Sequence, residues 1–312
     1  MAFLDQAKDY YSAAAASSSA SKPVLIYYAF LNAVKAYLLT MGHCPDLSTA
    51  RHGMTEKLSS GGVELTDAYL VCFPSVSGTV NIFDEFLKAT RGSALQTSLR
   101  LELPELLPQL VPGHRLWASA AGQTERFLGI HRIDCCKDSS TKEIWYRILL
   151  LEESLKRVNS SHQNCLEAAG LSTGWRDVGW DESADGRPLL CFEQISSVNY
   201  GHRPTDRIMD LVAKIRLKLW TTVVSAPPYR AYYLYVTPEA ERDSILPQLA
   251  SIYAVSFYLG SITRYRPQQF DSILTSEYGG LVETFLQEQP SQFLYLLASA
   301  FCRRDVTKAA LV

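Results

Sequence analysis

Four residues whose side chains commonly bind metal ions lie close together in the N-terminal part of the sequence. His43, Cys44, Asp46 and His52 supply imidazole, thiolate and carboxylate groups, the ligand types that zinc takes in proteins. Their spacing matches no standard zinc-binding pattern, and an ordinary polar loop contains the same residue types. We therefore expect no metal site here and no cofactor.

Arginine beside tyrosine is a second pattern that could bind a ligand. Arg264 and Arg266 flank Tyr265 at the predicted end of a helix. Guanidinium groups bind phosphate and aromatic rings stack on bases, so the pattern suits contacts with nucleic acid. Cations at a helix C-terminus also complement the helix dipole. Both explanations stay open for Arg264, whereas we prefer the dipole explanation for Arg303 and Arg304.

A further basic cluster occupies residues 200–220, where five cations outnumber two carboxylates. These residues are Arg203, Arg207, Lys214, Arg216 and Lys218 against Asp206 and Asp210. The whole chain has a formal net charge of −2 and a pI near 6.3. Nothing in the overall charge therefore indicates binding to nucleic acid or to an anionic membrane, although local patches remain compatible with it.

The cysteine and glycine patterns argue against a disulfide-bonded secreted protein and against a nucleotide hydrolase with a glycine-rich phosphate loop. Seven cysteines are an odd number and form no CxxC pair. With no signal peptide in the sequence, we expect reduced thiols and a cytoplasmic protein. No GxxxxGKS or GxGxxG segment is present, so nucleotide hydrolysis on a glycine-rich loop is unsupported.

Residues 21–42 (SKPVLIYYAFLNAVKAYLLTMG) form the predicted helix around which the chain is organised. Ser21 suits the N-cap, and Gly42 suits the left-handed position at the C-terminus. The helix is apolar nearly all round, which is typical of a helix that is buried or lies in a membrane. Because Asn32 and Lys35 lie well inside it on one face, we expect burial in protein and no membrane contact.

The remaining elements predict an α+β fold, mainly α. Residues 43–62 are predicted to be loop, and the middle of the chain contains most of the strands. Strands are expected within 63–80 and at 126–133, 143–151, 189–192 and 231–236, and helices at 3–14, 84–90, 103–110, 152–169, 211–220, 243–263, 270–277, 280–287 and 291–301. We expect residues 1–60 and 237–312 to form one helical bundle, with 61–236 as an inserted α/β region.

The sequence PVLIYYAFLNAVKAYLLTMG, followed by ARHGM, resembles the helix signature of HEPN-type domains, small helical bundles of prokaryotic defence and toxin systems. The closer resemblance is to the YaaC-like proteins, in which a similar helix and a His-Gly step open the chain. Near the C-terminus of those proteins an apolar helix ends in a Ser…Arg-Tyr step, as in residues 258–267 (YLGSITRYRP). The matching N-terminal residues are Tyr27, Tyr28, Ala29, Phe30, Ala33, Lys35, Ala36, Leu38, Leu39, His52 and Gly53. In the resembling families the His-Gly step caps its loop against the bundle.

The resemblance also raises ribonuclease chemistry. Catalytic HEPN proteins share an Arg-x4-6-His motif, in which histidine acts as base or acid and arginine steadies the phosphorane charge. Two segments fit this spacing, Arg126–His131 and Arg157–His162. The first lies in a predicted strand, where a five-residue separation places the two side chains on opposite faces. The second follows a predicted helix and is the better candidate, although about one such match is expected by chance.

These observations lead to a main hypothesis and two rivals. We expect a YaaC-like component of a bacterial multi-protein system, active in phage defence, that acts through contacts with a protein partner or a second copy rather than as an enzyme on its own. RNA or DNA would be an additional ligand. The expected binding residues are Asn32, Lys35, His52, Arg264, Tyr265 and Arg266. The rivals are a metal-independent ribonuclease and a structural subunit without nucleic-acid contact.

Overall fold

The chain folds into two compact units. The first comprises Met1–Gln123 and Ser244–Leu311, and the second comprises Thr124–Asp243. The structure is a computed structural model. It describes residues 2–59, 61–62, 64–159, 161, 164, 167–201, 204–216, 218–224, 229–238, 241 and 244–307, and it does not describe the side chains of residues 204, 213 and 214.

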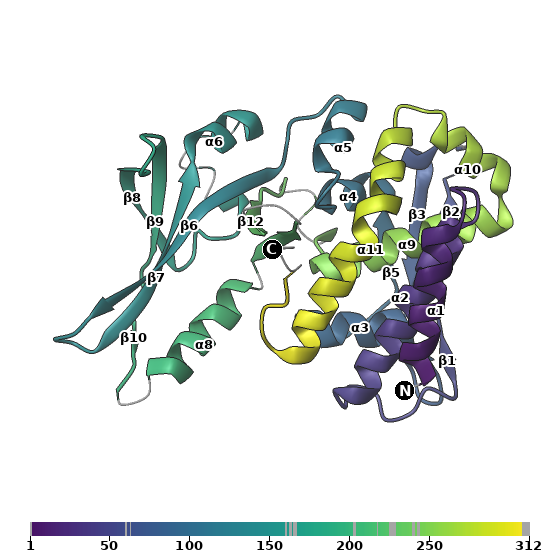
Figure 1. Cartoon of the computed structure of the whole chain (residues 1–312), viewed down its shortest axis with the longest axis horizontal. Helices are drawn as coiled ribbons and strands as arrows, with labels where there is room; N and C mark the ends of the chain where they lie inside the picture. Colours follow the sequence, from purple (N-terminus) through teal and green to yellow (C-terminus); the bar gives the residue numbers. More distant parts are fainter. Residues whose placement is uncertain are drawn as a thin grey trace. The chain divides into compact units, whose positions relative to one another are not determined.

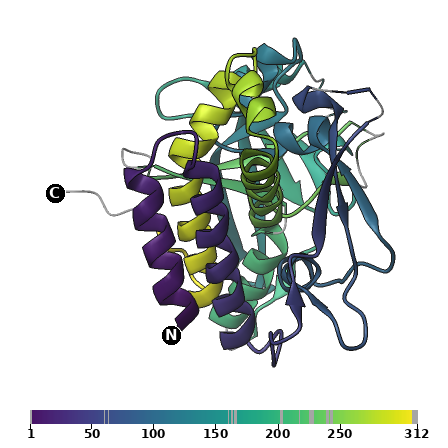
Figure 2. The same ribbon diagram turned by 90° about the vertical axis from the view of Figure 1, so that its right-hand side faces the viewer.

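Helices from both chain ends form the core of the first unit (Figures 1 and 2). Helices α1 (Ala2–Ala16), α2 (Lys22–Thr40), α9 (Gln248–Tyr265) and α11 (Gly279–Cys302) pack around α2. The rings of Phe30 and Phe293 stack at 3.9 Å between centroids and join α2 to α11. The predicted α+β class, with N-terminal helices packed on C-terminal ones, is confirmed.

Helix α2 is long and apolar enough to cross a membrane by length and composition alone. In the structure 67% of its most apolar window is buried by the rest of the unit. Its bounds agree with the prediction to within two residues: Ser21 precedes it, and Gly42 follows it in the left-handed region with φ of 71°. Burial of this apolar surface against the other helices explains why the helix forms.

Two helix predictions differ from the structure. Residues 279–302 form the single helix α11, whereas two helices separated at Pro290 were expected. Phe285 and Phe293 are fully buried on either side of the proline. Their packing outweighs the cost of an interior proline, about 3 kcal/mol. In contrast, α9 does end before Pro267, where α10 (Pro267–Leu274) begins.

The first unit also contains two small sheets and several short helices. Strands β2 (Met54–Leu58), β3 (Ala68–Cys72) and β5 (Leu99–Glu102) form an antiparallel sheet, while β1 (Ala50–Arg51) and β4 (Val80–Asn81) pair in parallel. The short helices are η1 (Leu65–Asp67), α3 (Ile82–Arg91), α4 (Leu103–Leu106), η2 (Leu107–Gln109) and α5 (His114–Ala120).

The division between the units lies later in the chain than the predicted boundary at residue 61. Leu70 of β3 and Phe83 and Phe86 of α3 are fully buried in the same hydrophobic core as α2 and α9. Residues up to 123 therefore belong to the first unit and not to the insertion. Strands β1 and β2 lie in the segment that was expected to be loop.

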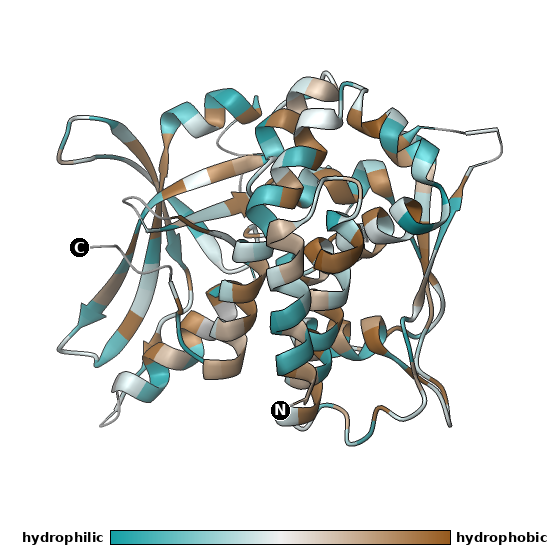
Figure 3. Cartoon of the chain, turned by 45° about the vertical axis from the view of Figure 1, so that its right-hand side comes forward, coloured by the Kyte–Doolittle hydropathy of each residue, from teal (hydrophilic) through white to brown (hydrophobic). Residues whose placement is uncertain are grey.

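The described residues of the second unit form one antiparallel sheet with helices beside it. Strands β6 (Phe127–Asp138), β7 (Glu143–Leu151), β8 (Trp175–Glu182), β9 (Pro188–Gln194), β11 (Leu219–Val223) and β12 (Arg230–Tyr235) run in the order β11-β12-β6-β7-β9-β8, and β10 (Val198–Asn199) pairs with β7. Hydrophobic and hydrophilic segments both occur along the strands of this unit (Figure 3), and β7 and β9 contain runs of apolar residues, Ile148–Leu151 and Leu189–Phe192. The core of the unit lies on one face of the sheet, where Leu211 and Ile215 of α8 (Pro204–Arg216) join it.

Two predicted helices of this unit are shorter than expected. Helix α8 ends at Arg216 and β11 begins at Leu219, so the predicted helix at 211–220 is divided between the two. Trp220 and Leu234 are buried in this strand pair, whose pairing with β6 extends the sheet. Helix α6 (Glu152–Val158) covers the beginning of the predicted helix at 152–169 and is followed by Asn159 in the left-handed region. Among the described residues further along this range, 164, 167 and 168 are again helical.

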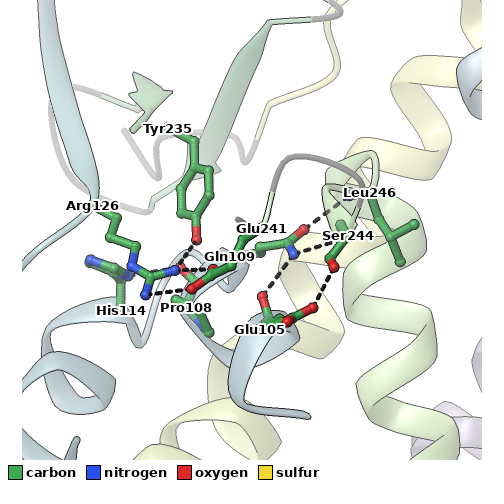
Figure 4. A network of polar contacts seen from close by, with 9 residues as sticks. All are labelled: Glu105, Pro108, Gln109, His114, Arg126, Tyr235, Glu241, Ser244 and Leu246. Carbon is green, nitrogen blue, oxygen red and sulfur yellow. Dashed lines mark hydrogen bonds and ion pairs between the residues drawn. The ribbon is translucent and has the colours of Figure 1, made fainter. Parts of the chain in front are cut away.

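Polar contacts brace each unit near the points where the chain passes between them (Figure 4). In the first unit the fully buried Gln109 donates to the carbonyls of Glu105 at 2.8 Å and Ser244 at 3.0 Å, and accepts from the Leu246 N–H at 3.1 Å. In the second unit Arg126 forms an ion pair with Glu241. Hydrogen bonds to a side-chain amide thus replace regular secondary structure where segments distant in the sequence meet.

Candidate functional site

A pocket of about 210 Å³ in the first unit joins the two segments that carried the sequence motifs. Helix α2 supplies Tyr27 and Tyr28, the segment around β2 supplies His52 and Glu56, and the last turns of α9 supply Arg264. Tyr265, Val24, Met54, Thr55, Phe257, Gly260 and Ser261 complete the lining. Residues more than 200 positions apart in the sequence therefore meet at one place.

Tyr27 and His52 form the polar centre of this pocket. The Tyr27 hydroxyl lies 2.5 Å from His52 Nδ1, and the Tyr27 ring contacts Phe257 edge-on. Burial raises the pKa of Tyr27 well above its usual value, and the neighbouring Tyr253 raises it further. The phenol therefore keeps its proton at neutral pH. When this hydroxyl donates to Nδ1, the neutral imidazole carries its own proton on Nε2.

The surroundings of His52 lower the pKa of its imidazole, although the residue as a whole is exposed. Burial is the largest cause that lowers its pKa, and the positive charges of Lys35 and Arg264 lower it further. Desolvation and like charges both oppose protonation of a histidine. A neutral His52 can exchange hydrogen bonds with a ligand, but it adds no positive charge to the pocket.

The backbone at the His52–Gly53 step ties this loop to the rest of the unit. The His52 carbonyl accepts from the Phe83 N–H at 3.2 Å, and the Gly53 carbonyl accepts from the Phe73 N–H at 2.9 Å. Gly53 has φ of 80°, and an added Cβ would lie 2.9 Å from Asn81 Cβ. Only glycine fits this left-handed, crowded position without strain. The loop-capping role implied by the family resemblance agrees with these contacts.

Arg264 supplies the positive charge at the pocket. Its Nη1 donates to the Tyr28 hydroxyl at 3.0 Å, and its guanidinium lies 4.9 Å from the centre of the Tyr265 ring. Tyr28 is held in turn by stacking on Tyr10 of α1 at 5.4 Å between ring centroids. Tyr265 is 63% exposed and forms part of the rim. The predicted binding residues His52, Arg264 and Tyr265 therefore line one pocket.

Arg266 lies beside the pocket and not in its lining. Its Nη2 is 3.6 Å from Oε1 of Glu56, which does line the pocket. The distance is that of an ion pair rather than a hydrogen bond. The Glu56 carboxylate thus has a compensating charge within the protein, and sequence reasoning missed Glu56 because residues 43–62 were expected to be loop.

Asn32 and Lys35 lie on α2 outside the pocket lining. Asn32 is buried, and its side-chain amide donates to the Tyr28 carbonyl one turn earlier at 2.9 Å. The Nζ of Lys35 lies 5.4 Å from the centre of the Phe3 ring, and burial lowers the pKa of Lys35. Lys35 affects the site through its charge, which acts on His52. The binding roles expected for these two residues remain predictions.

Close packing of two helices forms the floor of the pocket at Gly260. An added Cβ there would lie 3.0 Å from Tyr27 Cβ and 3.2 Å from the Pro23 carbonyl oxygen. A glycine at this position lets α9 approach α2 closely. It thereby places Tyr27 on one helix within reach of Phe257 on the other.

The two Arg-x4-His segments lie in the second unit. Arg157 contacts Glu125 at 3.5 Å and donates to the Ser154 hydroxyl at 3.2 Å, while His162 lies outside the described residues. Arg126 is paired with Glu241, and His131 is exposed on β6 at the register shift between Ile130 and Arg132. The pairing of Arg157 with His162 as catalytic residues therefore stays a prediction.

The candidate metal ligands have other contacts. Cys44 is buried and donates to the Asp46 carbonyl at 3.0 Å, and the ring of His43 lies beside that of Tyr37. No group of three or more His, Cys, Asp or Glu side chains within the described ranges is placed to hold a metal ion.

The basic cluster at residues 200–220 is only partly described. Arg207 pairs with Asp210 at 3.4 Å, whereas Arg203 and the side chain of Lys214 lie outside the described residues. Arg303 follows α11 in the left-handed region, with φ of 50°. Neither Arg207 nor Arg303 is among the residues that line the pocket.

A Gly-x-Ser-x-Gly sequence at residues 170–174 was not among the predicted sites. Its central Ser172 is exposed in a turn that leads into β8. In α/β-hydrolases the serine of this motif instead lies on a sharp turn from a strand into a helix. The arrangement in this unit therefore differs from that of a hydrolase elbow.

Comparison with known proteins identifies one family. The family model of the YaaC-like proteins matches residues 1–301, which include both units and the whole pocket. No curated protein and no solved structure gives a significant match. Because the match extends over nearly the whole sequence, the chain belongs to the YaaC-like protein family.

Proposed function

We propose that this protein is a binding component of a bacterial multi-protein system active in phage defence. In this proposal it acts through contacts with a protein partner, and its first unit is a HEPN-like bundle. The observation that carries the binding role is the convergence of Tyr27, His52 and Arg264 in one open pocket. The assignments to defence and to the HEPN class rest on the sequence resemblance alone.

The chemistry of the pocket suits recognition. The Tyr27 phenol keeps its proton at physiological pH, where burial raises its pKa further, and burial lowers the pKa of His52 so that the neutral imidazole is favoured. Arg264 provides one positive charge, and Tyr265 provides an exposed aromatic surface of the kind enriched in protein interfaces. A pocket with a defined hydrogen-bonding pattern, a single positive charge and an aromatic rim can select a ligand.

The ribonuclease alternative has no comparable support. Its arginine, Arg157, contacts Glu125 and Ser154 within the second unit. Cleavage would require a histidine near this guanidinium and room for a phosphodiester between them. We therefore rank the alternative below partner binding.

Affinity isolation of the tagged chain from its native host tests the proposal. Bound proteins are identified by mass spectrometry and bound nucleic acid by sequencing. We expect a protein partner in stoichiometric amount. Recovery of RNA with defined cut ends, and no protein partner, would replace this proposal with the ribonuclease.

A further inference from the structure

We propose that the pocket receives the C-terminal residue of the protein partner, with the terminal carboxylate on Arg264 and an apolar last side chain against Met54 and Phe257. The inference rests on the proposed function and names the chemistry by which the partner is recognised. It is carried by the charge, the size and the lining of the pocket.

The charge of Arg264 is uncompensated within the described part of the chain. Its contacts there are the Tyr28 hydroxyl and the Tyr265 ring, and neither is a carboxylate. Nearby Arg266, in contrast, pairs with Glu56. A guanidinium that uses one nitrogen for a tyrosine keeps further N–H groups for a carboxylate, which it binds in a bidentate manner.

The other polar groups favour a single negative charge over a phosphate. His52 is neutral, so Arg264 is the single cation among the residues that line the pocket. Glu56 places a carboxylate in the same lining. Arg266 partly offsets the charge of Glu56, and the remaining repulsion is stronger for a doubly charged phosphate than for a carboxylate. A phosphate would also meet only one cation in the lining, whereas a carboxylate matches that single positive charge.

The size and lining favour the end of a longer ligand. A volume of about 210 Å³ is below the roughly 300–1,000 Å³ of pockets that enclose a whole drug-sized molecule. Val24, Met54 and Phe257 make much of the wall apolar. One apolar side chain and a carboxylate fill such a space, and the preceding residues of the partner can lie across the exposed Tyr265 ring.

Peptide arrays test the inference with the purified full chain. The peptides are attached by their N-termini, carry mixed residues internally and end in each of the common amino acids. A matched array carries C-terminal amides. We expect binding to free carboxylates that follow Leu, Val, Ile, Met or Phe, with affinity for the amides about tenfold or more lower.

Two variants and one control locate the binding. Arg264→Gln removes the charge at an exposed position and should weaken peptide binding about tenfold or more. Thr55→Trp places a large side chain at an exposed position of the lining and should block entry. Arg304→Gln changes an exposed arginine outside the lining and should bind peptides as the wild type does. Circular dichroism confirms that each variant is folded.

Several results would overturn the inference. These are equal binding of acids and amides, unchanged binding by Arg264→Gln, or no binding to any peptide at millimolar concentration. Tighter binding of phosphoserine-ended peptides or of single-stranded RNA would refute recognition of a C-terminal carboxylate. If 3-phenylpropanoate binds as tightly as the peptides, the ligand of the pocket would be a small carboxylic acid and not a protein C-terminus. These assays use the chain alone. If they fail, the proposal that the chain binds a protein partner is still tested separately by affinity isolation.

Discussion

Replacement of Gly53 by alanine tests whether the His-Gly step holds the loop of the pocket in place. Gly53 has φ of 80°, and a left-handed conformation costs an ordinary residue about 1–2 kcal/mol. The new Cβ would also lie 2.9 Å from Asn81 Cβ and 3.3 Å from Asn81 Cα. Crowding of this kind costs about 1–3 kcal/mol. We therefore expect a loss of stability of about 3 kcal/mol in the first unit.

Gly78→Ala is the matched control for this variant. Gly78 has nearly the same φ, 79°, but an added Cβ would meet no atom within 4 Å. It should therefore show the conformational cost alone, about 1–2 kcal/mol. The difference between the two variants isolates the clash with Asn81.

Urea unfolding of each variant is monitored by hydrogen exchange in peptides from α2 and α9. These peptides report the loss of stability of the first unit for Gly53→Ala and for Gly78→Ala. Thermal unfolding should show a decrease in Tm of roughly 6–12 °C for Gly53→Ala. Equal losses for the two variants would refute the reasoning, because the backbone of Asn81 would then not confine Gly53.

The remaining predictions concern the core, pH and one buried carboxylate. Phe30→Ala removes a fully buried ring between α2 and α11 and should lower the free energy of unfolding in urea by about 3–5 kcal/mol. Leu39→Ala, at a 36% exposed site of the same helix, should lower it much less. Similar losses for the two variants would contradict the packing of Phe30 against α11. Because the pKa of His52 is lowered in the fold, the unfolded chain binds the proton more readily, so stability should be fully present above about pH 6.5 and fall as the pH drops below it. His52→Gln should reduce this dependence in thermal melts between pH 7.5 and 5, and an identical slope would exclude the assignment. Asp84 is buried and accepts from two backbone N–H groups at 2.7 and 2.6 Å, so Asp84→Asn should lower the free energy of unfolding by about 1–3 kcal/mol in urea, and no loss would show that these bonds contribute little.

Local signals in the sequence predicted the helices at the chain ends well. Helix α2 was recognisable because its apolar run, Ser21 and Gly42 mark both the element and its ends. The end of α9 before Pro267 followed from the geometry of proline. The break predicted at Pro290 was wrong, because α11 continues through the proline. The buried contacts that keep it continuous come from other helices and leave no signal in the local sequence.

The short strands of the first unit were harder to predict. Strands β1 and β2 lie in a polar, glycine-containing segment, and each is defined by its pairing with a distant strand. The compact units divide at residue 123, later than the predicted residue 61, because apolar residues between the two positions are buried in the same core as α2 and α9. Tertiary packing of this kind overrides local propensity.

The candidate site was predictable in its parts but not in its geometry. His52, Arg264 and Tyr265 were singled out from local motifs and the family resemblance, yet nothing in the sequence shows that they line one pocket. Glu56 carries no motif at all. Its role became visible once β2 was placed beside α9, where its carboxylate faces Arg266.

The most direct test of the account compares partner occupancy for wild type and Arg264→Gln, isolated from the native host at matched expression. Arg304→Gln serves as the control, because its exposed arginine lies outside the pocket lining. We expect a stoichiometric partner with wild type and Arg304→Gln, and a loss of most of that partner with Arg264→Gln. A partner retained in full by Arg264→Gln would contradict the claim that the pocket joining the two chain ends is the recognition site.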